Sequence, residues 1–354
     1  MNKRIQEART YLKGLDALLF YGHTNCTYLS HYTGSDAIVL IDPSRALLFV
    51  DSRNTLQARE ECIGFEVHEI SRQFEDVYPF VCSGHIKTIG VESDIIDFDT
   101  FMDIRDIFKG VELTPLGKQL SYLRVQKDPA EINTLKEAAL VSEKALEKTL
   151  EKGIVGRREC DVALAFEWEM RTLGASGLSF DLIVASGPRS AMPHGVASQR
   201  VICEGEPVLI DFGDVVGGYC SDQTVTLFAG EPTDEFTQIY AHVRKAQSMA
   251  IDALRPGIKA SKVDAIARDY LAAQGLGRYF GHGLGHGVGM DVHEKPVLSP
   301  KSDDILEQGM VLTVEPGVYI PGKFGIRLED TLCITDNSCM RITNLDKDAI
   351  RSII

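Results

Sequence analysis

The chain has 354 residues and a formal net charge of −14 at pH 7, with 44% hydrophobic and 25% charged residues. This composition is typical of a globular protein with about two domains, and it excludes a disordered chain. The acidic balance argues against nucleic acid or an anionic membrane surface as the main partner. Because "MNKRIQEARTYLKG" is polar and the apolar run after it is short, we expect no export signal, no membrane span and a cytoplasmic protein.

The first 120 residues alternate between apolar β-like runs and helical patterns, which predicts an α/β domain. The segment from Asp42 to Arg45 contains proline and serine and predicts a hairpin turn. The expected strands are 16–22, 36–41, 46–51 and 87–92, and the expected helices are 52–62 and 97–108.

A linking segment, "LTPLGKQLSYLRVQK", then precedes a long amphipathic pattern. Asp128 is expected to cap this helix, with Pro129 at its first position and Glu131 closing a capping box. We place the domain boundary here and expect one domain over 1–122 and another over 123–354. In the second domain three further helices alternate with hairpin-like segments, which predicts an α+β fold, and Trp168 on one of them is expected in the core. These helices are 160–174, 233–254 and 261–274.

Two expected hairpins of the second domain carry paired carboxylates. In "PVLIDFGDVVGGYCSDQTVTLF" a turn centred on Val216 and Gly217 would place Asp211 opposite Asp222. In "GMVLTVEPGVYIPGKFGIRLEDTLCI" a turn centred on Gly322 would place Glu315 opposite Glu329. Like charges directly opposite each other destabilise a sheet, so two such pairs in one domain indicate a cation between them.

The segment "YFGHGLGHGVGMDVHEKP" adds three histidines on a glycine-rich backbone. No phosphate-binding motif of the form G-x-x-x-x-G-K-[ST] occurs in the chain, and no G-x-S-x-G of a serine hydrolase. "HEKPV" is not the helical zinc motif H-E-x-x-H, because Val297 stands where the second histidine would be. Eight scattered cysteines without a C-x-x-C pair predict reduced structural thiols rather than a zinc ribbon.

Four carboxylates with an imidazole would balance two divalent ions in charge. Such an oxygen-rich set suits Mn²⁺, Co²⁺ or Zn²⁺. Two ions about 3.5–4 Å apart would hold a bridging hydroxide and stabilise a tetrahedral intermediate. The residues therefore predict a hydrolase with two metal ions.

The motif order "LIDFG…GYCSDQTVT…GHGVGMDVHE…VEPGVYI…GIRLEDT" resembles the metal-dependent peptidases with the pita-bread fold, which include methionine aminopeptidase, aminopeptidase P and prolidase. "NCTYLSHYTGSDAIVLI" and "LFVDSRNTLQA" resemble the creatinase-like extra domain of the Xaa-Pro peptidases, and "SGPRSAMPHG" matches the same branch. The resemblance covers nearly the whole chain. It implies a creatinase-like N-terminal domain followed by a pita-bread catalytic domain.

The resemblance also implies the metal ligands. Asp211 would bind one ion and Asp222 would bridge both. His286 and Glu315 would bind the other ion, with Glu329 as the second bridge. The ions implied are Mn²⁺ or Co²⁺, with Zn²⁺ as the alternative.

Histidines outside the ligand set are implied at the substrate. His194 and His293 would contact the scissile carbonyl or the tetrahedral species, and Glu315 would carry a proton to the leaving nitrogen. The glycines would let the backbone pass close to the metals and the substrate. His282 also stands in a G-H-G triplet, but its spacing to His293 disfavours it as a ligand, and we expect it to support the site.

The implied substrate is a small peptide with proline at its second position, cleaved before that proline. The chain departs from the family pattern at Val225, where an arginine is common, and at Val297, where some dipeptidases carry a basic residue. Lys295 lies near the second departure. The expected activity is Xaa-Pro dipeptidase, with Xaa-Pro aminopeptidase on longer peptides as the alternative. Metal-free hydrolysis on the same fold and a non-catalytic binding protein remain as further alternatives, and the resemblance implies a homodimer.

Overall fold

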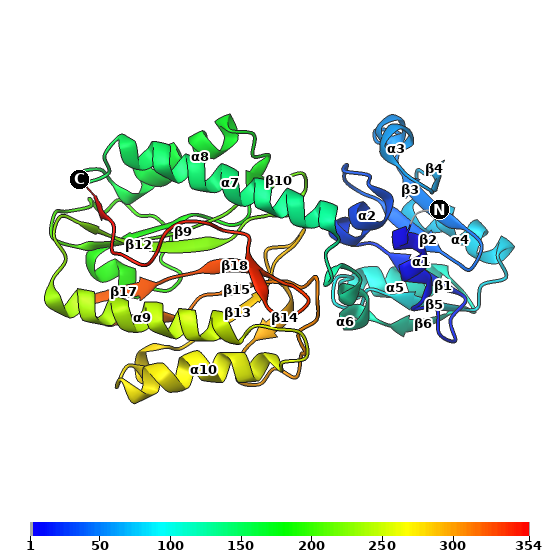
Figure 1. The fold of residues 1–354 in the computed structure, drawn as a ribbon. Helices are drawn as coiled ribbons and strands as arrows, with labels where there is room; N and C mark the ends of the chain where they lie inside the picture. The colour runs from blue at the N-terminus through cyan, green and yellow to red at the C-terminus, as the bar shows by residue number, and fades with distance from the viewer. Residues whose placement is uncertain (1–2, 354) are drawn as a thin grey trace. The chain divides into compact units, whose positions relative to one another are not determined.

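The computed structural model describes residues 3–353 and divides into two compact units. The first unit ends at Arg124 and the second begins at Val125. Figure 1 shows a mixed α/β arrangement in each unit. The α/β fold expected for the first unit and the α+β fold expected for the second are both confirmed.

The first unit is built on a six-stranded sheet with the order β4-β3-β2-β1-β5-β6. All neighbouring strands are parallel except β2, which runs antiparallel to both of its neighbours. The strands are β1 (Ala17–Phe20), β2 (Ile38–Ile41), β3 (Ala46–Val50), β4 (Glu66–Glu69), β5 (Thr88–Val91) and β6 (Glu112–Pro115). The helices are α1 (Lys3–Arg9), α2 (His23–Ser30), α3 (Thr55–Glu61), α4 (Gln73–Ser83), α5 (Phe98–Ile107) and α6 (Gly117–Leu120), followed by the 3₁₀ turn η1 (Ser121–Arg124).

The four strands expected from apolar runs are confirmed, and so is the turn between β2 and β3. Asp42 closes that turn by accepting hydrogen bonds from the backbone N–H groups of Ser44 and Arg45, at 2.8 and 2.6 Å. The sequence did not predict the two edge strands, β4 and β6, whose sequences are EVHE and ELTP. Their charged residues are suited to an exposed sheet edge, and they interrupt the apolar pattern by which the inner strands are recognised.

Four long helices and several small sheets form the second unit. The helices are α7 (Pro129–Glu151), α8 (Glu159–Thr172), α9 (Asp234–Ala253) and α10 (Ala260–Ala273). The capping box of α7 is formed as predicted, with Asp128 accepting from the N–H of Glu131 and the Glu131 side chain accepting from the N–H of Asp128. In Figure 1, α7 and α8 lie on one side of the strands, and α9 and α10 lie on the other.

The expected burial of Trp168 is wrong, because 70% of its surface is exposed. The buried row of α8 contains Val162, Phe166 and Met170, which recur every four residues. Trp168 lies two residues from both Phe166 and Met170, which places it about 200° around the helix from that row. A helical pattern alone does not say which face a single tryptophan occupies.

Two of the sheets carry most of the site described below. One has the order β20-β12-β9-β8 and packs with α7 and α8, and the other has the order β14-β13-β15-β18-β19 and packs with α9 and α10. A three-stranded sheet, β11-β10-β7, and the hairpin β16-β17 complete the unit. The strands are β7 (Gly177–Leu178), β8 (Ile183–Ser186), β9 (Pro207–Phe212), β10 (Asp214–Val216), β11 (Tyr219–Cys220), β12 (Gln223–Ala229), β13 (Gly285–Gly287), β14 (Glu294–Leu298), β15 (Val311–Val314), β16 (Gly317–Ile320), β17 (Phe324–Arg327), β18 (Asp330–Ile334), β19 (Cys339–Arg341) and β20 (Ser352–Ile353), with 3₁₀ turns η2 (Gly187–Ala191) and η3 (Gly277–Tyr279).

The first carboxylate hairpin has a register two residues away from the expected one. Val216 pairs with Tyr219, so the turn is centred on Gly217 and Gly218, and Asp211 lies opposite Thr224 rather than Asp222. Both glycines have positive φ, at +57° and +81°. A two-residue turn with positive φ at both central positions accepts Gly-Gly and strains a β-branched valine. Asp222 therefore becomes a diagonal neighbour of Asp211 on the adjacent strand.

The second hairpin has the expected register. Val314 pairs with Asp330 in one sheet, and Gly317 pairs with Arg327 in the next. Both pairings belong to one continuous register, and Glu315 opposes Glu329 in the two-residue gap between them. Gly322 in the turn has φ +74°, which a glycine accepts without strain.

Two further expectations concern the membrane and the cysteines. Among residues 3–353, no helix is both long enough and apolar enough to cross a bilayer. All eight cysteines lie in the described part of the chain and carry free thiols, which confirms the expectation of unpaired cysteines.

Candidate metal centre

The five expected ligands come from strands of both main sheets in the second unit. Asp211 lies in β9, and Asp222 comes directly before β12 in the same sheet. His286 is the middle residue of β13, Glu315 directly follows β15, and Glu329 directly precedes β18. Three of the four carboxylates therefore lie where regular strand pairing stops, and their side chains are free to converge.

Asp222, His286 and Glu329 each offer one ligand atom, and these three atoms lie within 4.8 Å of one another. The Nε2 atom of His286 is 3.6 Å from Oδ2 of Asp222 and 3.5 Å from Oε1 of Glu315. Two atoms that are each about 2.1 Å from one metal ion lie about 3.4 Å apart in tetrahedral geometry. The spacing of His286, Asp222 and Glu315 therefore fits shared coordination of an ion.

Asp211 completes the donor set. Its Oδ2 accepts a hydrogen bond from Arg327 at 2.5 Å, whereas its Oδ1 is buried and has no hydrogen-bond partner. A buried carboxylate oxygen without a partner is costly, and a cation would remove that cost. The carboxylates and the imidazole are donors that Mn²⁺, Co²⁺ and Zn²⁺ accept, so the residues fit a divalent metal site.

The pKa values of the carboxylates also indicate a cation at this site. Burial, together with repulsion from Glu329 and other carboxylates, raises the pKa of Asp222 and of Glu315 well above ordinary values. Burial and the charge of Asp211 raise the pKa of Glu329 to about 8. Four ionised carboxylates offset by one arginine would leave a buried charge of minus three. Two divalent ions and one hydroxide would bring that charge to zero.

Of the three histidines expected at the site, His286 is a half-buried candidate ligand, and His194 and His293 are exposed. Burial, and secondarily the proximity of His293, lowers the pKa of His286 to about 4, which keeps the imidazole in its neutral, ligating form. The His286 and His293 rings lie 4.3 Å apart between centroids. His293 and His194 are both exposed, and His194 follows Pro193, whose carbonyl accepts a hydrogen bond from Arg327 at 3.1 Å. Both exposed histidines remain accessible to a substrate.

The glycines beside His286 allow the close packing of neighbouring strands, and the expectation that they also admit the metals and the substrate stays a prediction. A Cβ atom on Gly285 would lie 2.1 Å from the carbonyl oxygen of Thr313, and one on Gly287 would lie 2.1 Å from that of Lys295. The strand that carries His286 therefore fits between its neighbours only without side chains at these two positions.

Comparison with known proteins assigns both units. Residues 4–126 match the creatinase/prolidase N-terminal domain, and residues 133–336 match metallopeptidase family M24. The chain belongs to metallopeptidase family M24. It is a metallopeptidase with a creatinase-type N-terminal domain and a pita-bread catalytic domain.

Three relatives illustrate the similarity. An uncharacterized peptidase of Bacillus subtilis is 41% identical over 95% of this chain and 96% of its own. The solved structure of an Xaa-Pro dipeptidase from Bacillus anthracis has 38% identity and a TM-score of 0.94, covering 98% of each chain. The crystal structure of an X-Pro aminopeptidase from Thermotoga maritima has 36% identity and a TM-score of 0.93, covering 99% of this chain and 100% of that one.

Arg327 is a site residue of this M24 peptidase that the sequence analysis did not identify. Its guanidinium donates to Asp211, to the hydroxyl of Tyr319 at 2.8 Å and to Oγ1 of Thr224 at 3.0 Å. Thr224 in turn donates to Glu329 at 2.7 Å. Arg327 precedes Glu329 by two residues, so strand alternation places both on one face. This two-residue spacing from Glu329 is the sequence feature that could have identified Arg327.

His282 joins the same network. Its Nε2 lies 3.0 Å from the hydroxyl of Tyr319, and burial, opposed in part by a backbone hydrogen bond, lowers its pKa to about 4. His282 therefore connects to Asp211 through Tyr319 and Arg327, in agreement with the expectation that it supports the site. It is not part of the cluster formed by Asp222, His286 and Glu329.

Proposed function

We propose that this M24 peptidase is an Xaa-Pro dipeptidase that cleaves the peptide bond before a proline, using two divalent metal ions. The observation that carries the proposal is the convergence of Asp222, His286 and Glu329 within 4.8 Å, beside the unpartnered buried oxygen of Asp211. The Xaa-Pro dipeptidase from Bacillus anthracis supports the choice of substrate. Asp211, Asp222, His286, Glu315 and Glu329 would hold the ions.

Two bound divalent ions supply an activated water at neutral pH and stabilise negative charge on the reacting oxygen. Each protein side chain then has a separate task. His293 or His194 would donate a hydrogen bond to the scissile carbonyl oxygen as negative charge develops on it. Glu315 would accept a proton from the nucleophilic water and deliver it to the leaving nitrogen.

A proline nitrogen has no N–H before cleavage, and its ring fixes φ near −65°. The proline nitrogen must therefore gain a proton when the bond is cleaved. Glu315 would deliver that proton. The exposed positions of His194 and His293 would leave room for the ring.

An Xaa-Pro aminopeptidase acting on longer peptides is the second proposal, and the structure around Val297 favours it. Lys295, the nearest basic residue in sequence, pairs with Asp304 at 3.0 Å and is occupied. Val297 itself lies opposite His286 in the β13–β14 pairing and carries no charge. The free carboxylate of a dipeptide substrate would therefore have to pair with a cation other than Lys295. The X-Pro aminopeptidase from Thermotoga maritima is comparably similar to this chain.

The remaining expectations are part of the same proposal. We expect Mn²⁺ or Co²⁺ as the working ions, with Zn²⁺ as the alternative, because the site is rich in oxygen donors. A cytoplasmic location is supported by the free thiols. A homodimer is expected from the family resemblance.

A paired hydrolysis assay tests the proposal. The full chain with added Mn²⁺ or Co²⁺ is incubated with Ala-Pro in one reaction and with Ala-Pro-Ala in another, and each reaction has an EDTA control. Cleavage of Ala-Pro that EDTA abolishes is the expected result. Cleavage of Ala-Pro-Ala alone would establish the aminopeptidase instead. Cleavage of neither peptide by protein that binds two ions would overturn both proposals and favour a binding protein.

A further inference from the structure

Helix α9 places one buried amide directly against the strands that carry two of the proposed ligands. Gln247 is fully buried, and its Nε2 group donates to the carbonyl oxygen of Val314 at 3.1 Å and to Oδ2 of Asp330 at 3.2 Å. Val314 and Asp330 are direct partners in the β15–β18 pairing. A single NH₂ group therefore contacts both strands at one rung of the ladder.

That rung is the last one before the carboxylate pair. Val314 directly precedes Glu315, and Asp330 directly follows Glu329. Beyond this rung the regular pairing stops for two residues. There the backbone N–H groups of Glu315 and Glu329 donate to Leu284 and Thr224 rather than to each other, and a long hydrogen bond from Leu328 to Pro316, at 3.4 Å, joins the two segments. At the rung next to the carboxylates, the amide of Gln247 ties both strands to helix α9.

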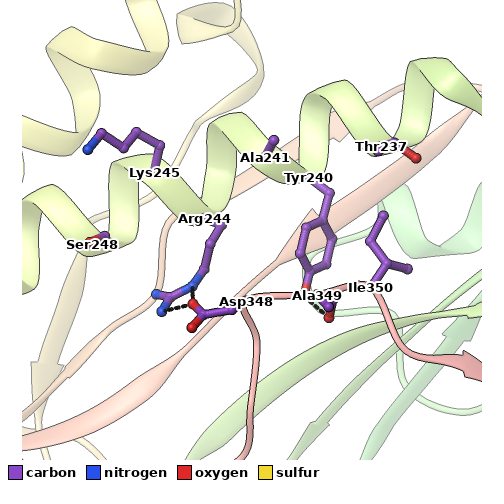
Figure 2. A pocket seen from close by; sticks show the side chains of 9 residues that line it. All are labelled: Thr237, Tyr240, Ala241, Arg244, Lys245, Ser248, Asp348, Ala349 and Ile350. Atoms are coloured by element: carbon purple, nitrogen blue, oxygen red, sulfur yellow. Dashed lines mark hydrogen bonds and ion pairs between the residues drawn. The ribbon is translucent and has the colours of Figure 1, made fainter.

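Arg244 fixes which way this amide points. It lies one turn earlier on α9 and donates from Nη1 to Oε1 of Gln247 at 2.9 Å. Its other nitrogens, Nε and Nη2, bind Oδ1 of Asp348 at 2.9 and 2.6 Å, as Figure 2 shows. A reversed amide would direct its oxygen at two acceptor oxygens and its NH₂ group at a guanidinium, which can only donate.

The acceptor on β18 is itself held in place. Asp330 is fully buried and pairs with Lys347 at 2.7 Å and with Arg341. Its side chain therefore gives Gln247 a fixed anionic partner rather than a mobile one. The resulting chain of contacts runs from Asp348 through Arg244 and Gln247 to the strands of Glu315 and Glu329.

We propose that Gln247, oriented by Arg244, is a positioning residue that sets the separation of Glu315 and Glu329 and thereby the affinity of the site for divalent ions. This inference rests on the proposed assignment of Glu315 and Glu329 as ligands. Groups that orient metal ligands without touching the metal typically change affinity or activity by about 10–100-fold when they are replaced. Gln247 acts through the backbone carbonyl of Val314 on β15 and through the side chain of Asp330, the neighbour of Glu329, on β18.

The test titrates Co²⁺ into the EDTA-treated full chain and follows binding by calorimetry and by the visible absorption of bound Co²⁺. Gln247→Met preserves volume and removes the amide, and it should weaken binding of at least one ion about 10-fold or more and change the absorption spectrum. Tyr240→Phe is the matched control. Tyr240 lies two turns earlier on α9, is buried, and donates to the carbonyl oxygen of Lys347 in the C-terminal segment and, as Figure 2 shows, to that of Ala349. It should lower the melting temperature while leaving the Co²⁺ titration unchanged.

A second pair of variants keeps the test decisive if Gln247→Met does not fold. Arg244→Met leaves Gln247 in place without its orienting donor, and should weaken Co²⁺ binding in the same direction. Lys245→Met is the control for this variant, because Lys245 is exposed on α9 next to Arg244 and lies outside this chain of contacts, and it should leave binding as in wild type. Wild-type binding and spectra in both Gln247→Met and Arg244→Met would overturn the positioning role. A wild-type chain that binds fewer than two Co²⁺ ions would instead overturn the proposed function, so the two failures are distinguishable.

Discussion

Arg327 and Asp211 form a buried ion pair beside the candidate metal centre, with Nη2 of the arginine 2.5 Å from Oδ2 of the aspartate. The same guanidinium reaches Thr224, which lies opposite Asp211 in the β9–β12 pairing and donates to Glu329. Arg327 therefore links two carboxylates of the cluster, Asp211 directly and Glu329 through Thr224.

Replacing Arg327 should destabilise the metal-free protein. Arg327→Met leaves the buried Asp211 without its cation, and breaking such a pair typically costs about 3–5 kcal/mol. Urea unfolding in EDTA measures the loss. Arg351→Met is the control, because its ion pair with Glu147 is about 40% exposed and such pairs contribute roughly 0–1 kcal/mol. Equal losses in the two variants would show that Arg327 does not compensate the cluster.

His286→Ala should remove one metal ion per chain. His286 is the nitrogen donor of the cluster, and its ring approaches both Asp222 and Glu315. Metal analysis should find one ion fewer, and kcat for Ala-Pro should fall about 1,000-fold if the lost ion provided several kcal/mol of transition-state stabilisation. His242→Ala removes a half-buried histidine whose Nδ1 lies 3.1 Å from the hydroxyl of Tyr270, and it should retain both ions. Full metal content in His286→Ala would contradict the ligand assignment.

The stability of the EDTA-treated protein should fall as pH rises from about 6.5 to 8. Burial and Asp211 raise the folded pKa of Glu329 to about 8 from an ordinary value of 4.5, so the folded state holds a proton that the unfolded state has lost. Where the folded state binds more protons, the free energy of unfolding decreases with pH, by up to about 1.4 kcal/mol per pH unit for each group. Below pH 6.5 the depressed pKa of His286 has the opposite effect, which is why the test window begins there.

Unfolding by urea at several pH values measures this slope. Glu329→Gln should make it shallower, because one of the three carboxylates of the cluster with a raised pKa no longer titrates. Saturating Mn²⁺ should abolish it, because bound carboxylates are already ionised. A stability that rises from pH 6.5 to 8 in EDTA would contradict the raised pKa of the cluster.

The sequence predicted the parts of the fold that local chemistry dictates. The inner strands of the first unit are apolar on both faces, and α7 begins at a capping box, so both could be recognised without tertiary information. The edge strands β4 and β6 were missed because pairing at the sheet edge, rather than their own composition, makes them strands. Trp168 was misplaced because its exposure depends on which face of α8 packs against the rest of the unit.

The two carboxylate hairpins show how much depends on the turn. Gly322 gave the correct centre for the second hairpin, and Glu315 and Glu329 face each other as predicted. The first hairpin was misaligned by two residues, although the requirement for positive φ at both central positions would have selected Gly217 and Gly218. Arg327 was missed because an arginine in a strand is usually exposed, and only the fold shows it buried against Asp211.

Val297→Arg should shift the preference of the enzyme toward dipeptides. Val297 is half-buried and lies directly opposite His286, and cross-strand partners project from the same face of a sheet. An arginine there would offer a bidentate donor to the free carboxylate of Ala-Pro, which a longer peptide does not present at that position. We expect kcat/KM for Ala-Pro to rise about 10-fold relative to that for Ala-Pro-Ala, mainly through a lower KM. Val297→Gln matches part of the added length without the charge and should leave the ratio near that of wild type. An equal increase in both variants would mean that side-chain length, not carboxylate capture, changes the preference.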